Sequence, residues 1–376
     1  MTNWSGAAAF TRNFTNCNFS PDANGMDDAQ KILAIQFKYL GDAVFITPAL
    51  RAIKEHRPDC ELHVLVSEDV APLLEHDPWL TKVWAMPRTR GQARFRESWP
   101  VIRALRRERF DRSVDFAGND RGAIVSWLCN ARERLGPFES GGFWGRKKCY
   151  NATVPGAALP DSWVHRHLQL LAAWQIPPPK SCHLEINASP ALAEAAARLL
   201  PDSGVFCHIA TSHPKKEWPL PHWIQLYHKA ASVGHQLVFS AGPGHRERAL
   251  LDELKRMEPA LVALPPVTDL GLFLAVLKRA KLVIAGDTGP LHFAAGLGVP
   301  VIGLFGTKDS ILRALPIYER GCAVTGGSCT CQSDAAACDS LHPCMASISP
   351  NQVFDALLAV LETTRPSQPL ETICKT

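Results

Sequence analysis

The sequence LVIAGDTGPLHFAAGLGVPVIGLF, residues 282–305, contains a complete strand, helix and strand. The apolar runs at its two ends are typical of buried strands, and the spacing of apolar residues in 291–297 predicts a helix between them. Pro290 favours the first helical position, so we expect Gly289 to be the N-cap. Two parallel strands joined by a helix are the repeating unit of an α/β sheet.

The same alternation extends to both sides of this unit. In the second half of the chain it predicts strands at 205–209 and 236–240, and helices at 222–231, 245–257 and 270–279. In the first half it predicts strands at 32–37, 62–66, 82–86 and 113–116, and helices at 49–56, 102–108, 123–129 and 164–176. This pattern predicts an α/β protein with two doubly wound, Rossmann-like domains that face a cleft.

Three consecutive prolines, 177–179, cannot continue a helix and suit a stiff linker between the two domains. The predicted organisation is a disordered extension (1–28), an N-terminal domain (29–177), a C-terminal domain (180–349) and a last helix that packs back toward the N-terminal domain (350–364).

Length and composition limit the class of protein. The 376 residues are 46% hydrophobic, which is enough for two substantial cores. No run approaches the roughly 20 apolar residues of a membrane-spanning helix, and the first 28 residues lack the apolar core of a signal peptide. We therefore expect a cytoplasmic protein, with most of its 12 scattered cysteines reduced.

Basic residues concentrate in one segment. Nine arginines lie between Arg88 and Arg112 against three carboxylates, whereas the net charge of the whole chain is only +4. Such a segment suits an anionic glycan, an anionic lipid surface or nucleic acid, and it is equally typical of a solvated helix face. Nucleic acid is the least favoured partner, because it would leave the motifs described next without a role.

The first motif is KYLGD, residues 38–42, which follows the strand predicted at 32–37. Ligands of open α/β sheets bind at the carboxyl ends of the strands, so Asp42 is placed where a reacting group would meet it. Its carboxylate is suited to act as a general base toward a hydroxyl group. The alternative is that Asp42 only caps the following helix.

The second motif is GDTGPLH, residues 286–292. The free N–H groups of a helix that starts here would form a diphosphate site, to which Thr288 adds a hydroxyl and His292 a donor. An ordinary capped turn with a core histidine is the alternative. The third motif, TSHPKKEWP at 211–219, follows the strand at 205–209 and would bring hydroxyls and a lysine to the same edge. A lysine there can neutralise a departing diphosphate, although most lysines are simply exposed.

Other sequence features exclude or leave open further chemistry. The chain shows neither the six-position glycine pattern of dinucleotide-binding folds nor a lysine-bearing P-loop, which argues against NAD enzymes and NTPases. A cysteine-rich segment precedes the last helix, and its spacing lacks a clean double C-x₂-C pattern. A thiol-rich loop without metal is the default expectation, with a zinc or iron site as the alternative; the candidate ligands are Cys329, Cys331, Cys338 and Cys344.

These segments together resemble glycosyltransferase family 9, the bacterial lipopolysaccharide heptosyltransferases. Three stretches carry the resemblance, which runs from about residue 32 to residue 361: GDAVFITPAL (41–50), FDRSVDFAGNDRGAI (110–124) and GDTGPLHFAAGLGVPVIGLFG (286–306). The resemblance implies a GT-B fold, with the acceptor on the N-terminal domain and a nucleotide-sugar donor on the C-terminal domain. It also implies an inverting, metal-independent transfer without a cofactor.

The resemblance also implies roles for particular residues. Asp42 occupies the place of the catalytic base, and Lys216 matches a lysine on the donor phosphate, with Lys215 as the alternative. Lys38 and Arg121 are the expected acceptor contacts. The remaining expected donor-binding residues are Thr211 or Ser212, Asp287, Thr288, Gly289 and His292.

The expected donor is ADP-heptose and the expected acceptor is a lipopolysaccharide core or a related glycan, with peripheral contact to the inner membrane. Two other functions fit the same pattern of motifs. A nucleotide-sugar epimerase of this fold would act without an acceptor, and a non-catalytic protein would bind glycans or nucleotide sugars without turnover.

Overall fold

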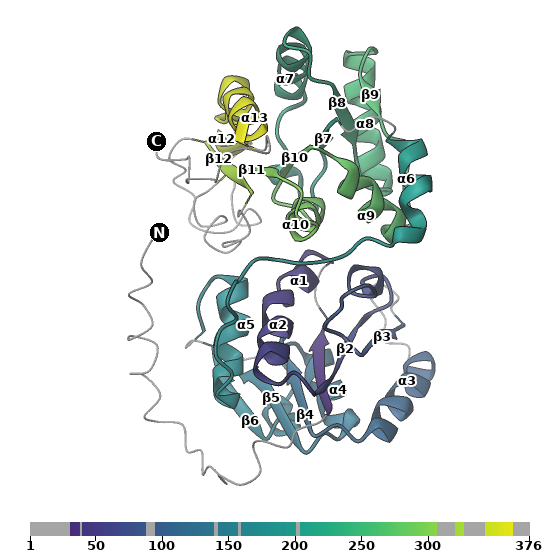
Figure 1. The fold of residues 1–376 in the computed structure, drawn as a ribbon, viewed down its shortest axis with the longest axis vertical. Coiled ribbons are helices and arrows are strands. Elements are labelled where there is room, and N and C mark those ends of the chain that lie inside the picture. The colour runs from purple at the N-terminus through teal and green to yellow at the C-terminus, as the bar shows by residue number, and fades with distance from the viewer. Residues whose placement is uncertain are drawn as a thin grey trace.

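The computed structural model describes residues 31–37, 40–87, 95–138, 142–156, 159–200, 204–306, 320–326 and 343–363. The predicted extension at 1–28 lies outside this part of the chain. Two bodies of alternating strands and helices stack on each other, and residues 177–189 cross between them (Figure 1). No helix within the described ranges has the length and hydropathy to cross a membrane.

The first sheet has six parallel strands in the order β3-β2-β1-β4-β5-β6. Its strands are β1 (Lys31–Gln36), β2 (Glu61–Ser67), β3 (Lys82–Met86), β4 (Arg112–Asp115), β5 (Glu133–Phe138) and β6 (Ala152–Pro155). Its helices are α1 (Leu40–Val44), α2 (Thr47–His56), α3 (Phe95–Glu108), α4 (Asp120–Cys129) and α5 (Trp163–Leu171), with short 3-10 turns η1 (Ala71–Leu73), η2 (Arg146–Cys149) and η4 (Ala172–Trp174).

The second sheet has six parallel strands in the order β12-β11-β10-β7-β8-β9, which is the same connectivity as the first sheet. Its strands are β7 (Val205–His208), β8 (Leu237–Ser240), β9 (Val262–Ala263), β10 (Leu282–Gly286), β11 (Val301–Phe305) and β12 (Gly321–Thr325). Its helices are α6 (Ala193–Leu199), α7 (Leu220–Ser232), α8 (His245–Met257), α9 (Leu270–Arg279), α10 (Gly289–Gly296), α12 (Pro343–Ala346) and α13 (Pro350–Thr363), with the 3-10 turn η6 (Pro214–Lys216). The prediction of two doubly wound sheets is confirmed.

Each sheet is covered on both faces, as an all-parallel sheet requires. In the first half, α3 and α4 pack on one face through Leu105 and Val125, and α2 and α5 cover the other. In the second half, α7, α8 and α13 share one core, while α6, α9 and α10 pack on the opposite face. The apolar cluster that contains α2 and α5 continues into α9 and α10, so one core runs across the junction of the two halves.

The last helix differs from its prediction. α13 contacts α7, β11 and β12, and Val353, Leu357 and Val360 lie in the core of the second half. The expectation that this helix packs back toward the N-terminal domain is therefore wrong. The apolar stripe of α13 is buried against the second sheet, and burial of an apolar stripe decides where a helix packs.

The segment between the two halves is fastened on both sides. The Arg51 guanidinium from α2 lies 2.6 Å from the Glu185 carboxylate and donates to the carbonyl of Ser181 at 2.9 Å. On the other side, the N–H of Ile186 donates to the carbonyl of Gly296 at the end of α10. Residues 181–186 of the linker are thus hydrogen-bonded to α2 on one side and to α10 on the other, which fixes the position of one helix relative to the other.

Candidate active site

The first part of the candidate site is the turn after β1. The chain enters α1 at Leu40, which places Asp42 in the first turn of that helix, and the Asp42 side chain is half-buried. The side-chain amide of Gln36, the last residue of β1, donates to the carbonyl of Asp42 at 3.3 Å. Ala43 and Val44, which follow, are buried, so the helix has one fixed orientation. Lys38 lies outside the described residues.

The turn after β4 supports the turn after β1. The Asn119 amide donates from Nδ2 to the carbonyl of Phe37 at 2.8 Å, while its Oδ1 accepts from the N–H of Gly122 and caps α4. The guanidinium of Arg121 lies 4.4 Å from the centre of the Phe37 ring and donates to the carbonyl of Pro87. The predicted acceptor contact Arg121 therefore lies at the same sheet edge as Asp42. Sequence analysis missed the role of Asn119, which an Asn before a helical run signals.

The second part of the site is the start of α10. Thr288 is the N-cap, and Gly289 and Pro290 are the first two helical residues, so the expectation of Gly289 as N-cap is displaced by one position. Proline is accommodated there because the N–H groups of the first turn have no acceptor within the helix. The Thr288 side chain makes no capping bond to the helix. The start of α10 therefore presents backbone donors in a half-buried position.

Asp287 connects two cationic or donor side chains at this helix start. The Lys216 ammonium donates to Oδ2 of Asp287 at 2.8 Å, and Nε2 of His292 lies 3.5 Å from Oδ1. Burial alone would raise the pKa of the Asp287 carboxyl, but the hydrogen bonds and charges of His292 and Lys216 outweigh it and hold that pKa well below its ordinary value. Asp287 thus stays ionised and fixes both partners.

His292 is almost fully buried, with 6% of its surface exposed. Nε2 faces Asp287, whereas Nδ1 has no hydrogen-bond partner among the described residues. A buried ring nitrogen without a partner is costly, and sites where such groups occur are often sites that a ligand completes.

The loop after β7 reaches the same place because Gly286 has no side chain. A Cβ on Gly286 would lie 2.9 Å from the Lys216 carbonyl and 3.0 Å from Cγ2 of Thr211. The Thr211 hydroxyl donates to the carbonyl of His213 and thus shapes its own loop, whereas Ser212 is exposed. Lys216 thus reaches Asp287 directly.

Sequence analysis also missed Arg246, in the first turn of α8. Its guanidinium contacts the Glu217 carboxylate at 2.6 Å and donates to the carbonyl of Thr211. The glycine turn at 242–244, which precedes α8, was the available signal for a helix start at this edge. Arg246 therefore braces the loop that carries Lys216.

The two parts of the site meet across the junction. A Cβ on Gly41 would lie 3.0 Å from Cδ2 of His292 and 3.7 Å from Cα of Gly289. α1 stands at the top of the first half and α10 at the base of the second (Figure 1), and the two helices contact each other. The residue that follows Gly41 is Asp42, so the candidate base and the candidate anion site belong to one region.

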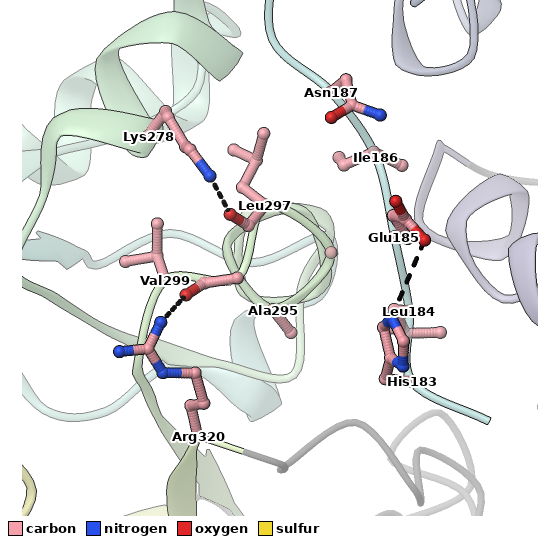
Figure 2. Close-up of a pocket in the computed structure, with 12 residues that line it drawn as sticks. His183, Leu184, Glu185, Ile186, Asn187, Lys278, Ala295, Leu297, Val299 and Arg320 are labelled. Carbon is pink, nitrogen blue, oxygen red and sulfur yellow. Dashed lines mark hydrogen bonds and ion pairs between the residues drawn. The ribbon is translucent and has the colours of Figure 1, made fainter. Parts of the chain in front are cut away.

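A cavity of about 240 Å³ lies at the opposite, carboxyl-terminal end of α10 (Figure 2). The Lys278 ammonium donates to the Leu297 carbonyl, and the Arg320 guanidinium donates to the Gly298 carbonyl. Both cations therefore supply hydrogen bonds to carbonyl groups that follow the end of α10. The linker residues Glu185 and Asn187 form the other wall (Figure 2). This cavity is separate from the candidate active site.

The metal alternative finds no support in the described part of the chain, where no group of three or more His, Cys, Asp or Glu side chains could hold a metal ion. Cys344 lies in α12 and is half-buried. Cys329, Cys331 and Cys338 lie outside the described residues.

Comparison with known proteins identifies the family. Residues 98–343 match the sequence profile of glycosyltransferase family 9 (heptosyltransferase). The chain is 24% identical over 352 residues to lipopolysaccharide heptosyltransferase 2 of Salmonella typhimurium, covering 88% of this chain and 98% of the relative. It is 23% identical over 286 residues to lipopolysaccharide heptosyltransferase 3 of Escherichia coli, covering 73% and 83%.

Solved structures show the same fold. The ADP-heptose heptosyltransferase II of E. coli superposes with a TM-score of 0.70 at 17% identity, covering 89% of this chain and 99% of that one. A family 9 glycosyltransferase of Veillonella parvula gives a TM-score of 0.73 at 16% identity, covering 90% and 99%. From its profile match, this chain belongs to glycosyltransferase family 9, the heptosyltransferases.

Proposed function

We propose that this protein transfers heptose from ADP-heptose to a hydroxyl group of a lipopolysaccharide core. The names of its relatives favour heptosyl transfer, and one of the similar structures holds an ADP-heptose analogue. One observation carries the assignment of the site: Gly41 packs against His292 and Gly289, which brings the Asp42 turn to the start of α10.

In this proposal Asp42 is the general base. Asp42 is half-buried in the first turn of α1, at the carboxyl edge of the first sheet, where ligands of open α/β sheets bind. A carboxylate in that position accepts the proton of the acceptor hydroxyl as the oxygen attacks. The acceptor would approach past Arg121, which lies at the same edge.

The donor diphosphate would occupy the start of α10. Backbone N–H groups at Thr288 and Gly289 and the positive end of the helix dipole favour an anion there. Lys216 adds a charge and His292 a donor. Asp287 is itself anionic, so we assign it to positioning Lys216 and His292 and not to direct contact with the diphosphate.

The reaction would be a single in-line displacement. The acceptor oxygen forms a bond to the anomeric carbon while the bond from that carbon to the diphosphate breaks, and the configuration inverts. The hydroxyl proton goes to Asp42, and ADP leaves with its new negative charge facing Lys216, His292 and the α10 N–H groups. Stabilising that charge with donors that are already in place is the main contribution proposed for the second half.

In this proposal the acceptor is a lipid-linked glycan, and we infer that the enzyme works in the cytoplasm, at the inner face of the inner membrane. The first half would bind this acceptor and the second half the nucleotide sugar.

The test is a donor panel with purified protein. ADP release from ADP-heptose should require a heptose-acceptor core oligosaccharide, and UDP- and GDP-sugars should be poor donors. Conversion of a sugar nucleotide without any acceptor would favour an epimerase instead. Binding of ADP-heptose without turnover on any core acceptor would favour the non-catalytic protein.

A further inference from the structure

The loop GFWGRKK, residues 142–148, presents aromatic and basic side chains to solvent. Trp144 is 92% exposed and Phe143 is 38% exposed, whereas bulky aromatic side chains are largely buried in most folded proteins. Lys147 and Lys148 are exposed beside them, and the Lys148 ammonium lies 5.3 Å from the centre of the Trp144 ring. We call this segment the aromatic–basic loop.

The loop is held in a fixed shape. Gly142 and Gly145 have φ angles of +82° and +98°, which glycine adopts without strain. The buried Arg146 guanidinium lies 3.5 Å from the Asp120 carboxylate, which also accepts from the N–H of Phe143. The fixed backbone of the loop therefore holds Trp144 in its exposed position.

The surrounding face has the same character. α4 contacts both η2 and α3, and its own Trp127 is 57% exposed. Trp99 on α3 is 46% exposed. The exposed cations on α3 are Arg96, Arg103, Arg106 and Arg107, and the exposed carboxylates on α3 and α4 are Glu97 and Asp120.

We propose that this face docks on an anionic lipid bilayer, with Phe143 and Trp144 entering the interface and Lys147 and Lys148 on the lipid phosphates. Tryptophan beside lysine and arginine is the composition that suits the polar boundary of a membrane. A second copy of this chain would bring like charges together. A glycan-stacking role would call for a ring lying in a groove, and Trp144 at 92% exposure stands clear of the surface.

The position of the loop relates docking to the proposed function, on which this step rests. Asp120, which holds the loop, is followed directly by Arg121 at the acceptor edge of the first sheet. A bilayer in contact with the aromatic–basic loop would therefore place lipid-linked acceptors beside Arg121.

The experiment is sedimentation of the full chain with vesicles of phosphatidylethanolamine and phosphatidylglycerol in a ratio of about three to one. We expect binding to these vesicles and little to vesicles of phosphatidylcholine alone. Lys147→Glu with Lys148→Glu should weaken binding by about 20-fold or more, since each cation near the surface contributes a factor of roughly five. Phe143→Ser with Trp144→Ser should also reduce the amount of protein that sediments with the vesicles.

The matched control is Met257→Ser with Lys255→Glu, which makes similar changes to exposed residues of α8 in the other half and should leave vesicle binding unchanged. Transfer to delipidated core oligosaccharide should be the same in all variants, and transfer to vesicle-embedded acceptor should fall only in the loop variants. Equal vesicle binding by loop and wild-type proteins would overturn the proposal. Slower transfer to the delipidated acceptor in the loop variants would instead make the loop an acceptor contact. Because vesicle binding needs no turnover, failure of the proposed enzymatic function would be seen separately.

Discussion

The Phe45 ring packs on the imidazole of His292 with the ring centroids 4.8 Å apart, and the two residues belong to different halves of the protein. Phe45 directly follows α1, and His292 lies in the first turn of α10. A rotation of one half against the other would therefore move this imidazole relative to Asp42. The contact therefore fixes the position of the proposed anion site relative to the proposed base.

Asp42→Asn should remove the base while keeping the shape of the side chain. We expect kcat to fall by about 10²- to 10⁴-fold, the usual contribution of a positioned base. The affinity for ADP should stay close to that of the wild type, because the anion site lies on the second half. Steady-state kinetics and calorimetric titration with ADP measure the two quantities. Near-normal turnover in the variant would reject Asp42 as the base.

Lys216→Ala and Lys215→Ala form a matched pair of neighbouring lysines. Only Lys216 is seen paired with Asp287, at 2.8 Å. Its loss should raise KM for the donor by about 10- to 100-fold, the range for a hydrogen bond to a charged group, and leave KM for the acceptor nearly unchanged. Lys215→Ala should behave like the wild type. The reverse order of effects would assign the donor contact to Lys215.

Gly41→Val would place a branched side chain where a Cβ alone comes within 3.0 Å of His292. The halves would be pushed apart, and turnover should fall by about tenfold or more because small displacements of reacting groups are costly. Gly41→Ala should show a smaller effect in the same direction. Because one apolar core spans the junction, the overpacked contact should also lower the free energy of unfolding by about 1–3 kcal/mol, which denaturant titration checks. Wild-type turnover in Gly41→Val would show that the packing of α1 on α10 does not limit the reaction.

Asn119→Ala and Asn119→Asp separate two roles of one side chain. The alanine variant loses the cap of α4 and should be destabilised by about 1 kcal/mol. In the wild type, Nδ2 of Asn119 donates to the Phe37 carbonyl at 2.8 Å. Aspartate keeps a capping oxygen but has no N–H group to donate to that carbonyl. If Asn119 positions the turn that carries Asp42, kcat should fall in both variants. A fall in kcat that only follows the loss of stability would leave Asn119 with the capping role alone.

Asp77→Asn tests a buried carboxyl near the linker. Burial is the largest influence on Asp77 and raises its pKa from 3.8 to about 6. The folded state thus prefers the protonated form, and stability should fall as pH rises from 3.8 to about 6 and stay low above it. The asparagine variant, whose oxygen still accepts from the N–H of Trp79, should gain on the order of 2–3 kcal/mol over the wild type at neutral pH. This gain in unfolding free energy should vanish as the pH falls to 3.8. A difference in unfolding free energy that does not vary with pH would contradict this account.

The sequence predicted the two sheets and the main motifs but not every element. Strands β5 and β6 were missed because they are short, β5 contains Gly136 and Pro137, and β6 ends in Pro155. A side chain at position 136 would collide with Tyr150, whose ring closes over this strand, and that reason for a glycine is visible only in three dimensions. Helix α3 was expected to begin at residue 102, yet it begins at Phe95 and continues through Pro100.

The candidate site residues could be placed at the sheet edges because they follow strands, and strand ends are readable from periodicity. What the sequence could not give is how they pair. Nothing in the spacing indicates that Asp287 joins Lys216 to His292, or that Gly41 is the point of contact between the halves, because these distances depend on the packing of α1 against α10. The packing direction of α13 was missed for the same reason.

The two sheets share one strand connectivity, and in each sheet candidate site residues lie on the turns after its first and fourth strands. The two halves therefore carry the proposed acceptor and donor residues at equivalent sheet edges. If the proposed function holds, acceptor preference can change through residues of the first half while the donor-binding residues of the second half stay the same. Swapping halves between relatives would then have to preserve the fit of α1 to α10, the linker contacts and the apolar cluster that spans the junction.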